Sequence, residues 1–283
     1  MRTLLHLSDL HFGRVDEALL QPLQSFARKL GPDLVVVSGD LTQRARSEQF
    51  RQARQFLDGL PTPQIVVPGN HDVPLFDIVS RFFRPRTKFR RYISRTERPS
   101  YVDEEIAVVG VDTTRSLTIK DGRINAQQIA QVRAVLDPLP KGLVKIIVSH
   151  HPFDLLDPRD ENDLVGRAPL AMREFASSGV DILLSGHLHV SRSGEASMRR
   201  QGHNEAALLI QAGTATSTRS RGESNTFNVI RIATRRIDVQ RVVWQTESQA
   251  FVEAESERFD RCDAGWRRAE RSSGASPSRI VDN

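Results

Sequence analysis

Short apolar runs that end in polar residues recur along this 283-residue chain, and they constrain its fold more than any other feature. The runs are rich in Val, Ile and Leu, and each is followed at once by Ser, Gly or Pro-Gly and then by Asp, Asn or His. Short β-branched runs of this kind are typical of buried strands. The runs cover residues 3–7, 34–37, 65–67, 146–148 and 182–184.

Helix-like segments separate several of these runs. Residues 16–30, 46–60 and 126–136 carry apolar side chains at helical spacing. Strands that alternate with helices predict an α/β core with helices packed on the sheet. Ligands bind beyond the carboxyl ends of the strands in such sheets. We therefore expect the polar ends of the five runs to meet at one rim.

The pattern changes after His189. Strand-like segments then follow one another without helices, which predicts a second, antiparallel sheet packed on the first. We expect one domain over residues 1–260 and a disordered tail over residues 261–283, because Gly, Ser, Pro and Arg dominate from Ala264 onward. The strand-like segments are residues 192–198, 206–212, 226–232 and 235–244, with 251–259 as a further candidate.

Composition excludes several classes of protein. A hydrophobic content of 39% over this length is sufficient for a full core. Cys262 is the only cysteine, which excludes an internal disulfide framework and a thiolate metal cluster and fits a reducing compartment. No stretch approaches ~18 consecutive apolar residues, and the first residues are too soon interrupted for a signal peptide. The sequence thus predicts a soluble, cytoplasmic protein without a membrane span.

The polar residues at the ends of the runs are metal ligands by type. They offer only oxygen and nitrogen donors, which suit Mn, Fe or Zn. Seven ligands are too many for one ion, and a carboxylate such as Asp40 can bridge two metals ~3.5 to 4 Å apart. The sequence therefore predicts a site for two divalent ions. The candidate ligands are Asp9, His11, Asp40, Asn70, His150, His187 and His189.

In order and spacing, five motifs resemble the calcineurin-like metallophosphoesterase family. Within that family the chain is most similar to the bacterial class III cyclic nucleotide (3′,5′-cAMP) phosphodiesterases. The resemblance implies an α/β fold, a four-layer α/β/β/α sandwich of two packed mixed β-sheets flanked by helices. The motifs are Asp9-Leu10-His11, Gly39-Asp40, Gly69-Asn70-His71-Asp72, Ser149-His150-His151-Pro152 and Gly186-His187-Leu188-His189.

The resemblance also implies a role for each motif residue. A hydroxide that bridges the two ions would attack phosphorus in line. His71 would be the general acid that protonates the leaving oxygen, and Asp72 would hold the orientation of the His71 ring. The first metal would be held by Asp9, His11, Asp40 and His189, and the second by Asp40, Asn70, His150 and His187.

Asn70 and His151 have more ordinary interpretations as well. Asn70 to Asp72, taken alone, are typical of a turn, although five ordered motifs at strand ends disfavour that interpretation. As a ligand, the neutral amide of Asn70 would hold a metal without adding negative charge where a phosphate approaches. For His151 a structural role is favoured over contact with substrate.

The insertion at about residues 74–100 is basic and aromatic. The favoured interpretation is an amphipathic helix-loop whose aromatic rings dock on the core while its arginines face water. The alternatives are an anion-steering rim or a homodimer contact beside the site. Single-stranded nucleic acid is a less favoured partner. The aromatic residues are Phe82, Phe83, Phe89 and Tyr92, and the basic ones are Arg81, Arg84, Arg86, Lys88, Arg90, Arg91, Arg95 and Arg98.

The sequence and the resemblance together predict a dinuclear metal-dependent phosphohydrolase that cleaves phosphodiester bonds, first of all in cyclic nucleotides or related small phosphodiesters. A nucleotide or lipid pyrophosphatase, a phosphomonoesterase or a nuclease of the same superfamily is the alternative among enzymes. A non-catalytic protein-binding scaffold is the alternative of another class, because a fold does not determine a function.

Overall fold

The computed structural model describes residues 1–75, 77–96, 98–118, 120–157, 163–200, 203–219 and 223–269. Its strands are β1 (Arg2–Leu7), β2 (Leu34–Ser38), β3 (Gln64–Val67), β4 (Ser100–Val102), β5 (Ile106–Gly110), β6 (Val144–Val148), β7 (Ile182–Ser185), β8 (Arg192–Arg200), β9 (His203–Gln211), β10 (Thr226–Ala233), β11 (Arg236–Gln245), β12 (Ala250–Cys262) and β13 (Gly265–Arg268). Its helices are α1 (Leu20–Leu30), α2 (Ser47–Asp58), α3 (Ile78–Phe83), α4 (Thr87–Tyr92), α5 (Ala126–Leu136) and α6 (Ala168–Ser177), with 3-10 turns η1 (Glu17–Leu19) and η2 (Asn70–Asp72).

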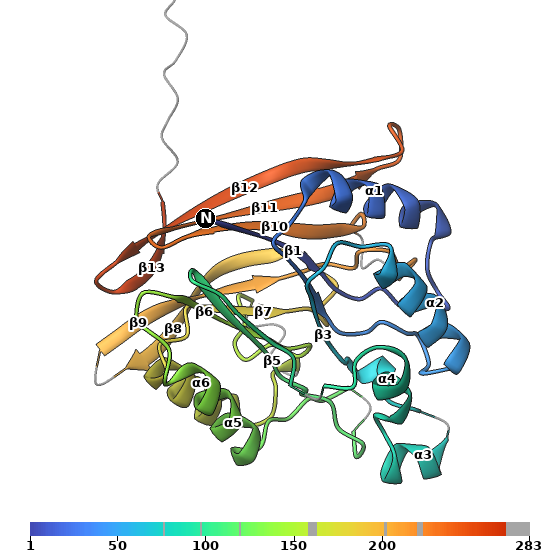
Figure 1. Ribbon diagram of the computed structural model, residues 1–283, viewed down its shortest axis with the longest axis horizontal. Helices are drawn as coiled ribbons and strands as arrows, with labels where there is room; N and C mark the ends of the chain where they lie inside the picture. Colours follow the sequence, from blue (N-terminus) through green and yellow to red (C-terminus); the bar gives the residue numbers. More distant parts are fainter. Residues whose placement is uncertain are drawn as a thin grey trace, which may run out of the picture.

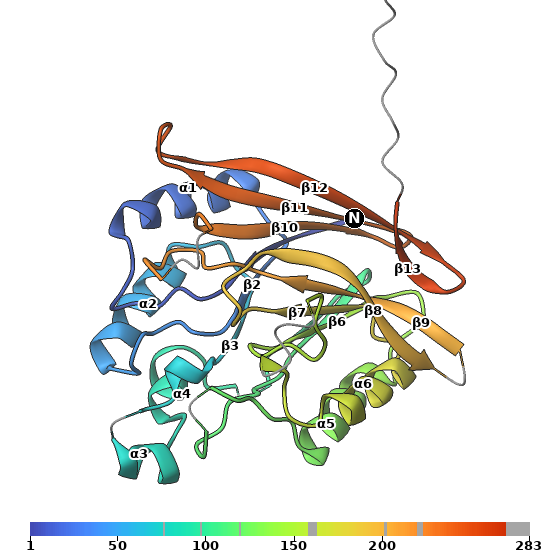
Figure 2. The same ribbon diagram turned by 180° about the vertical axis from the view of Figure 1, so that it is seen from behind.

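Two half-sheets face each other at the centre of the molecule (Figures 1 and 2). One half-sheet has the strand order β3-β2-β1-β10-β11-β12, and the other has the order β4-β5-β6-β7-β9, with β8 paired to β9. In the first half-sheet β2 pairs parallel with β1 and β3, and in the second β6 pairs parallel with β5 and β7. The antiparallel pairs are β1–β10, β10–β11, β11–β12, β4–β5 and β8–β9. Strand β13 pairs with β12 and meets β9, so it links the two halves. Both halves are therefore mixed.

The expected second sheet, made only of the late antiparallel strands, is wrong. Strands β10 to β12 extend the half-sheet of β1 to β3, while β8 and β9 extend the half-sheet of β5 to β7. The sequence shows which segments are strands but not which edge each one joins, because edge choice depends on the tertiary packing. The four-layer arrangement of two mixed half-sheets flanked by helices is confirmed.

Both faces of the central strands are buried. The inner core lies between the half-sheets and includes Leu4 and Val36 from one side and Ile146 and Leu184 from the other. Helices α1, α2 and α4 cover the outer face of the first half-sheet, and α5 and α6 cover the second. Full burial of each such side chain contributes about 1.5–3 kcal/mol, which is why the runs are apolar without alternation.

The end of the fold lies further along the chain than predicted. Residues Gly265–Arg268, expected to be disordered, form β13. The Trp266 side chain is buried, and its Nε1–H donates to Asp181 Oδ1 at 3.0 Å. The Gly, Ser, Pro and Arg content of this segment predicted disorder, but the large apolar side chain of Trp266 attaches the segment to the core. Residues 270–283 of the expected tail lie outside the described residues.

The aromatic residues of the insertion divide into two groups. Phe89 is buried, and Tyr92 stacks on Phe50 of α2 with 6.2 Å between ring centroids, as the helix-loop interpretation predicts. Phe82 and Phe83 are instead 49% and 81% exposed. Docking on the core therefore holds for α4 and is wrong for α3.

Arg81 also departs from the helix-loop interpretation, because it faces protein and not water. The side chain is buried and donates to the backbone carbonyls of Pro74, Ser116 and Thr118 at 3.0, 2.7 and 2.6 Å. One planar guanidinium thus satisfies acceptors from two irregular loops.

Among the described helices, none has the length and apolar character needed to cross a bilayer.

Candidate metal centre

The predicted ligands follow the carboxyl ends of strands from both half-sheets, and five of them have left-handed backbones. The φ angles are 53° at Asp9, 51° at His11, 50° at Asp40, 72° at His187 and 59° at His189. Residues other than glycine rarely adopt this conformation, although Asp and His do so more often than most. Such strain costs about 1–3 kcal/mol per residue and concentrates at functional sites.

Two glycines make room for this crowding. Gly39 has φ +91°, and a Cβ there would lie 2.6 Å from His150 Nδ1. A Cβ on Gly69 would lie 2.2 Å from Asp40 Oδ1. The loops after β2 and β3 can therefore approach the centre only with glycine at these positions.

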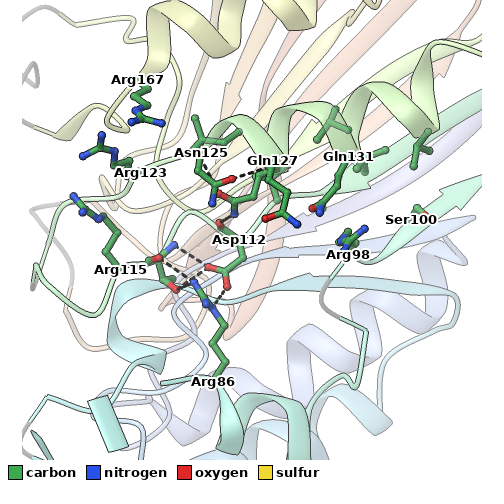
Figure 3. A pocket seen from close by; sticks show the side chains of 18 residues that line it. Arg86, Arg98, Ser100, Asp112, Arg115, Arg123, Asn125, Gln127, Gln131 and Arg167 are labelled. Carbon is green, nitrogen blue, oxygen red and sulfur yellow. Dashed lines mark hydrogen bonds and ion pairs between the residues drawn. The ribbon is translucent and has the colours of Figure 1, made fainter. Parts of the chain in front are cut away.

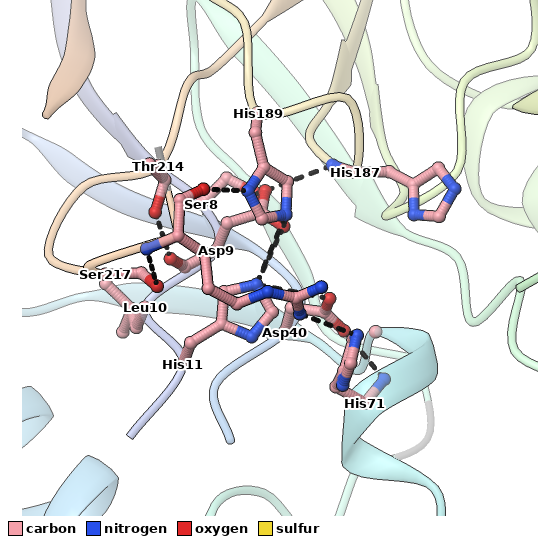
Figure 4. A network of polar contacts seen from close by, with 12 residues as sticks. Ser8, Asp9, Leu10, His11, Asp40, His71, His187, His189, Thr214 and Ser217 are labelled. Carbon is pink, nitrogen blue, oxygen red and sulfur yellow. Dashed lines mark hydrogen bonds and ion pairs between the residues drawn. The ribbon is translucent and has the colours of Figure 1, made fainter. Parts of the chain in front are cut away.

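The first cluster joins Asp9, His11, Asp40 and His189, which are all buried (Figure 4). One ligand atom from each of the four lies within 4.8 Å of the others. His189 Nε2 is 3.2 Å from Asp9 Oδ1 and 3.3 Å from His11 Nε2. His11 Nε2 is 3.6 Å from Asp40 Oδ2.

Hydrogen bonding within the first cluster fits a cation. The Nδ1 of His189 lies 3.1 Å from the Arg219 carbonyl and donates to it, so Nε2 is the ring atom that faces the cluster. Nε2 lies 3.3 Å from His11 Nε2 and 3.2 Å from the buried Asp9 Oδ1. Converging lone pairs repel one another unless a cation or proton lies between them.

The second cluster surrounds the Nε2 of His150. This atom lies 3.0 Å from Asn70 Oδ1, 3.2 Å from His187 Nδ1 and 3.5 Å from Asp40 Oδ1. The Nδ1 of His150 donates to the Ser38 carbonyl at 2.9 Å, so Nε2 carries a lone pair here too. A second group of donor atoms therefore points at one small volume.

Asp40 belongs to both clusters. Its Oδ2 faces His11 of the first cluster, and its Oδ1 faces His150 of the second. One carboxylate oxygen for each cluster is the arrangement that a bridging ligand of two ions requires. The residues present therefore fit a two-metal centre.

Electrostatics keep the two carboxylates ionised. Burial opposes the ionisation of Asp9, but His189 and His11 outweigh it and hold the pKa of Asp9 well below its usual value. Burial likewise opposes ionisation of Asp40, and the surrounding imidazoles, His150 foremost, lower its pKa. Burial lowers the pKa of His150, although the charges of Asp40 and Asp9 oppose the change. Burial opposes protonation of His189, but the charge of Asp9 and a hydrogen bond to it outweigh burial and raise the pKa of His189, so a bound ion would take the place of that proton. Carboxylates and neutral imidazoles are the ligating forms.

His151 lies beside the second cluster but has no free nitrogen. Its Nδ1 lies 2.8 Å from Thr113 Oγ1, and its Nε2 lies 2.7 Å from the Lys120 carbonyl. The ring is fully buried, and its centroid is 4.6 Å from that of His187. These contacts match the structural role favoured for His151.

His71 stands at the edge of the first cluster, and its backbone N–H donates to Asp40 Oδ1 at 2.8 Å. The ring Nδ1 lies 2.9 Å from the Gln43 carbonyl and donates to it, and Nε2 accepts from Arg219 Nη1 at 3.0 Å. Burial lowers the pKa of His71, although the charge of Asp40 opposes the change. The ring is thus neutral, with its lone pair held by Arg219.

The expected contact between Asp72 and the His71 ring is wrong. Asp72 accepts from the backbone N–H groups of Gly69, Leu41 and Thr42 at 3.0, 3.1 and 2.8 Å, and from Thr42 Oγ1 at 2.9 Å. In the 3-10 turn η2, consecutive side chains point in different directions, so Asp72 ties the loop after β3 to the loop after β2.

These four donors oppose the effect of burial on the pKa of Asp72. Burial raises the pKa of Asp72 to about 7, and the charge of Asp40 adds to this shift, whereas the hydrogen bonds from Gly69, Leu41 and Thr42 lower it. A carboxylate at this position is therefore held by its loop contacts against a strong desolvation cost.

Several residues around the centre were not predicted from the sequence. Arg219 contacts His71 through its guanidinium and His189 through its carbonyl. Thr214 Oγ1 donates to the Asp9 carbonyl at 2.7 Å, and Asp163 Oδ1 lies 3.4 Å from His187 Nε2. Only Thr214 had a signal, because it directly follows the apolar run 206–212 and Gly213, as the ligands follow theirs.

Comparison with known proteins identifies the family. The profile described as Calcineurin-like phosphoesterase matches residues 2–191, which include all five motifs. This chain belongs to that family. All predicted ligands of the two clusters lie within the matched residues.

Named relatives of this calcineurin-like phosphoesterase are phosphodiesterases. The chain is 27% identical over 163 residues to the "Probable glycerophosphodiester phosphodiesterase GpdQ" of Arcobacter nitrofigilis, an alignment that covers 56% of this chain and 57% of the relative. It is 29% identical over 216 residues to the "cAMP/cGMP dual specificity phosphodiesterase MT0825" of Mycobacterium tuberculosis, covering 66% and 62%. The chain thus spans less than two thirds of each relative's length.

A solved structure shares the fold. The dimetal phosphatase from Danio rerio superposes with a TM-score of 0.62 at 15% sequence identity, and the superposition covers 91% of this chain and 98% of the zebrafish chain. At this identity the likeness concerns the fold alone.

Proposed function

We propose that this protein is a dinuclear metal-dependent phosphodiesterase that acts on cyclic nucleotides or related small phosphodiesters. The observation that carries the proposal is Asp40, whose two oxygens face two clusters of potential metal ligands. Both relatives above bear the names of phosphodiesterases, one for a glycerophosphodiester and one for cyclic nucleotides.

The ligand set supports two ions of the Mn, Fe or Zn type, because all donors are oxygen or nitrogen. When bound, such ions supply a water nucleophile of lowered pKa and positive charge for the phosphate. Asp9, His11, Asp40 and His189 would hold one ion, and Asp40, Asn70, His150 and His187 would hold the other.

His71 is proposed as the general acid that protonates the leaving oxygen. Its Nδ1 is held by the Gln43 carbonyl, so Nε2 is the ring atom that can carry the transferred proton. In the structure Arg219 occupies that position. Protonation of Nε2 therefore requires the guanidinium to turn away, and an incoming phosphate oxygen is a better partner for it than a neutral imidazole. Arg219 would then bind substrate as His71 gains its proton.

Asp72 is proposed as a positioning residue and not as a partner of the His71 ring. Its four hydrogen bonds fix η2, the turn that presents both Asn70 and His71. The cytoplasmic location, the homodimer and the nucleic-acid partner stay predictions.

A substrate screen tests the proposal. Protein loaded with Mn²⁺ is assayed on cAMP, cGMP, glycerophosphodiesters, nucleotide monoesters, dinucleotide pyrophosphates and single-stranded DNA. We expect the highest kcat/KM on a small phosphodiester, with activity lost in Asp40→Ala. A metal-bound protein that is inactive on every one of these substrates would instead support the scaffold interpretation, and preference for a pyrophosphate or DNA would replace the substrate class.

A further inference from the structure

A cavity of about 540 Å³ opens beside α5, between this helix, the loop after β5 and the insertion (Figure 3). Its volume lies in the range of small-molecule sites. We call it the arginine pocket. The arginines that line it are Arg86, Arg98, Arg115, Arg123 and Arg167.

Arginines outnumber carboxylates in the part of the arginine pocket that the structure describes. There, Asp112 is the only carboxylate among the lining residues, and it forms an ion pair with Arg86. Within the described ranges, no side-chain hydrogen bond or ion pair involves the other four arginines. Like charges gathered in a concave site focus a positive potential and attract an anion.

The arginine pocket is separate from the metal centre. None of its lining residues is a predicted metal ligand. Thr113, whose hydroxyl contacts His151 at 2.8 Å, lies between the two sites, with Asp112 and Thr114 on the pocket side. An anion in this pocket would therefore not touch the metal ligands.

Three arginines gather at one end of the pocket, as Figure 3 shows for Arg115, Arg123 and Arg167. A bridge between Arg123 and Gly166 brings two separate loops together, with Ile124 N–H donating to the Gly166 carbonyl at 3.2 Å. Arg167 has a left-handed φ of +70°. The fold thus holds three cations from two loops at one end of the pocket, an arrangement suited to more than one phosphate.

The other end of the pocket is different in chemistry. Figure 3 draws Gln131 of α5 and Arg98 on the side away from the three arginines, with Gln127 between, and Val132 and Val135 supply apolar lining. A primary amide both donates and accepts, which suits the edge of a nucleobase. Apolar side chains can pack against the face of the base.

We propose that the arginine pocket binds a nucleoside polyphosphate. The phosphate chain lies against Arg115, Arg123 and Arg167, and the base lies toward Gln127 and Gln131. This site is independent of the proposed phosphodiesterase reaction, since it uses neither the metals nor their ligands.

Isothermal titration calorimetry tests the proposal with adenosine 5′-(β,γ-imido)triphosphate and with inorganic tripolyphosphate. The full chain is titrated when metal-loaded and again after the metals are removed by a chelator. We expect nucleotide binding to persist without metals. Arg115→Ala and Arg167→Ala should each weaken it about 10- to 100-fold, the effect of losing one hydrogen bond to a charged group. Arg235→Ala, which removes an exposed arginine far from the pocket, should not change it.

A second comparison tests the orientation of the ligand. Gln131→Ala should weaken binding of the nucleotide analogue but leave tripolyphosphate unaffected. Nucleotide-analogue affinity that Gln131→Ala leaves unchanged, or weakens only as much as it weakens tripolyphosphate affinity, would overturn the base contact. Nucleotide affinity that is unchanged in Arg115→Ala and Arg167→Ala, or that disappears with the metals, would overturn the site itself. Wild-type affinity measured from 50 to 300 mM salt gives a readout independent of any variant, and a lack of salt dependence would also contradict the proposal.

Discussion

The candidate metal centre and the arginine pocket differ in the charge of the side chains that each brings together. At the candidate metal centre, carboxylate and amide oxygens and imidazole nitrogens converge on two small volumes. The arginine pocket is lined by five arginines, exposed or half-buried, and by a single carboxylate among the described residues. The first arrangement is complementary to cations and the second to anions. In the first, the ligands are integral to the strand ends and their backbone is strained, whereas the second is assembled from loops and one helix face.

The largest expected effect comes from Asp40→Ala, because this residue joins the two clusters. Both ions should be lost, and kcat/KM on a small phosphodiester should fall at least about 10³-fold, since the ions supply several kcal/mol of transition-state stabilisation. His189→Ala is the matched variant and should preferentially weaken one ion. Metal analysis after dialysis checks both. Two ions retained by Asp40→Ala would remove the bridging assignment, and nucleotide affinity in the arginine pocket should be unaffected by either change.

His71→Ala separates proton transfer from metal binding. Metal content should stay the same, because the described contacts of the His71 ring are with Gln43, Arg219 and the His11 ring. The rate on a cyclic nucleotide should fall about 10²- to 10⁴-fold, the range for one acid–base group. The loss on bis(p-nitrophenyl) phosphate should be smaller, because a nitrophenolate leaves without protonation. Equal losses on metal-replete protein would mean that His71 positions phosphate and does not protonate the leaving group.

Asp72→Asn tests whether the hydrogen bonds between the loops after β2 and β3 also stabilise the fold. The carboxylate accepts hydrogen bonds from backbone N–H groups, whereas the amide nitrogen of asparagine would face those same donors without accepting from them. The free energy of unfolding should therefore fall by about 2–4 kcal/mol. Urea unfolding of the metal-free protein measures the change. Asp121→Asn, at an exposed aspartate, is the control and should stay within about 0.5 kcal/mol. Equal stability of the two variants would show that the four contacts of Asp72 contribute little.

The smallest effect is expected from Arg98→Ala in the arginine pocket. Arg98 is exposed and makes no side-chain hydrogen bond or ion pair in the described part of the chain, so its removal should change the free energy of unfolding by less than about 0.5 kcal/mol. The same urea experiment applies. A loss as large as that of Asp72→Asn would mean that the pocket arginines support the fold, and the contrast between the two sites would disappear.

The sequence alone determined much of the metal centre. Buried strands must be apolar on both faces, so polar residues at their ends stand out, and Asp9, Asp40 and His150 could each be assigned to such an end. Crowding at a strand end also demands glycine, as at Gly39. These signals are local in the chain, and local patterns are what a single sequence displays.

Tertiary structure decided what depends on distant segments meeting. The late strands extend both half-sheets, the hydrogen bond and burial of Trp266 anchor β13, and Asp72 contacts the loop after β2 instead of the His71 ring. Arg219 contacts His71, which lies 148 positions earlier in the sequence. The arginines of the pocket come from the insertion, the loop after β5 and the residue before α6. A hydrogen bond or a shared potential depends on distance in space, and the folded backbone alone makes those distances short.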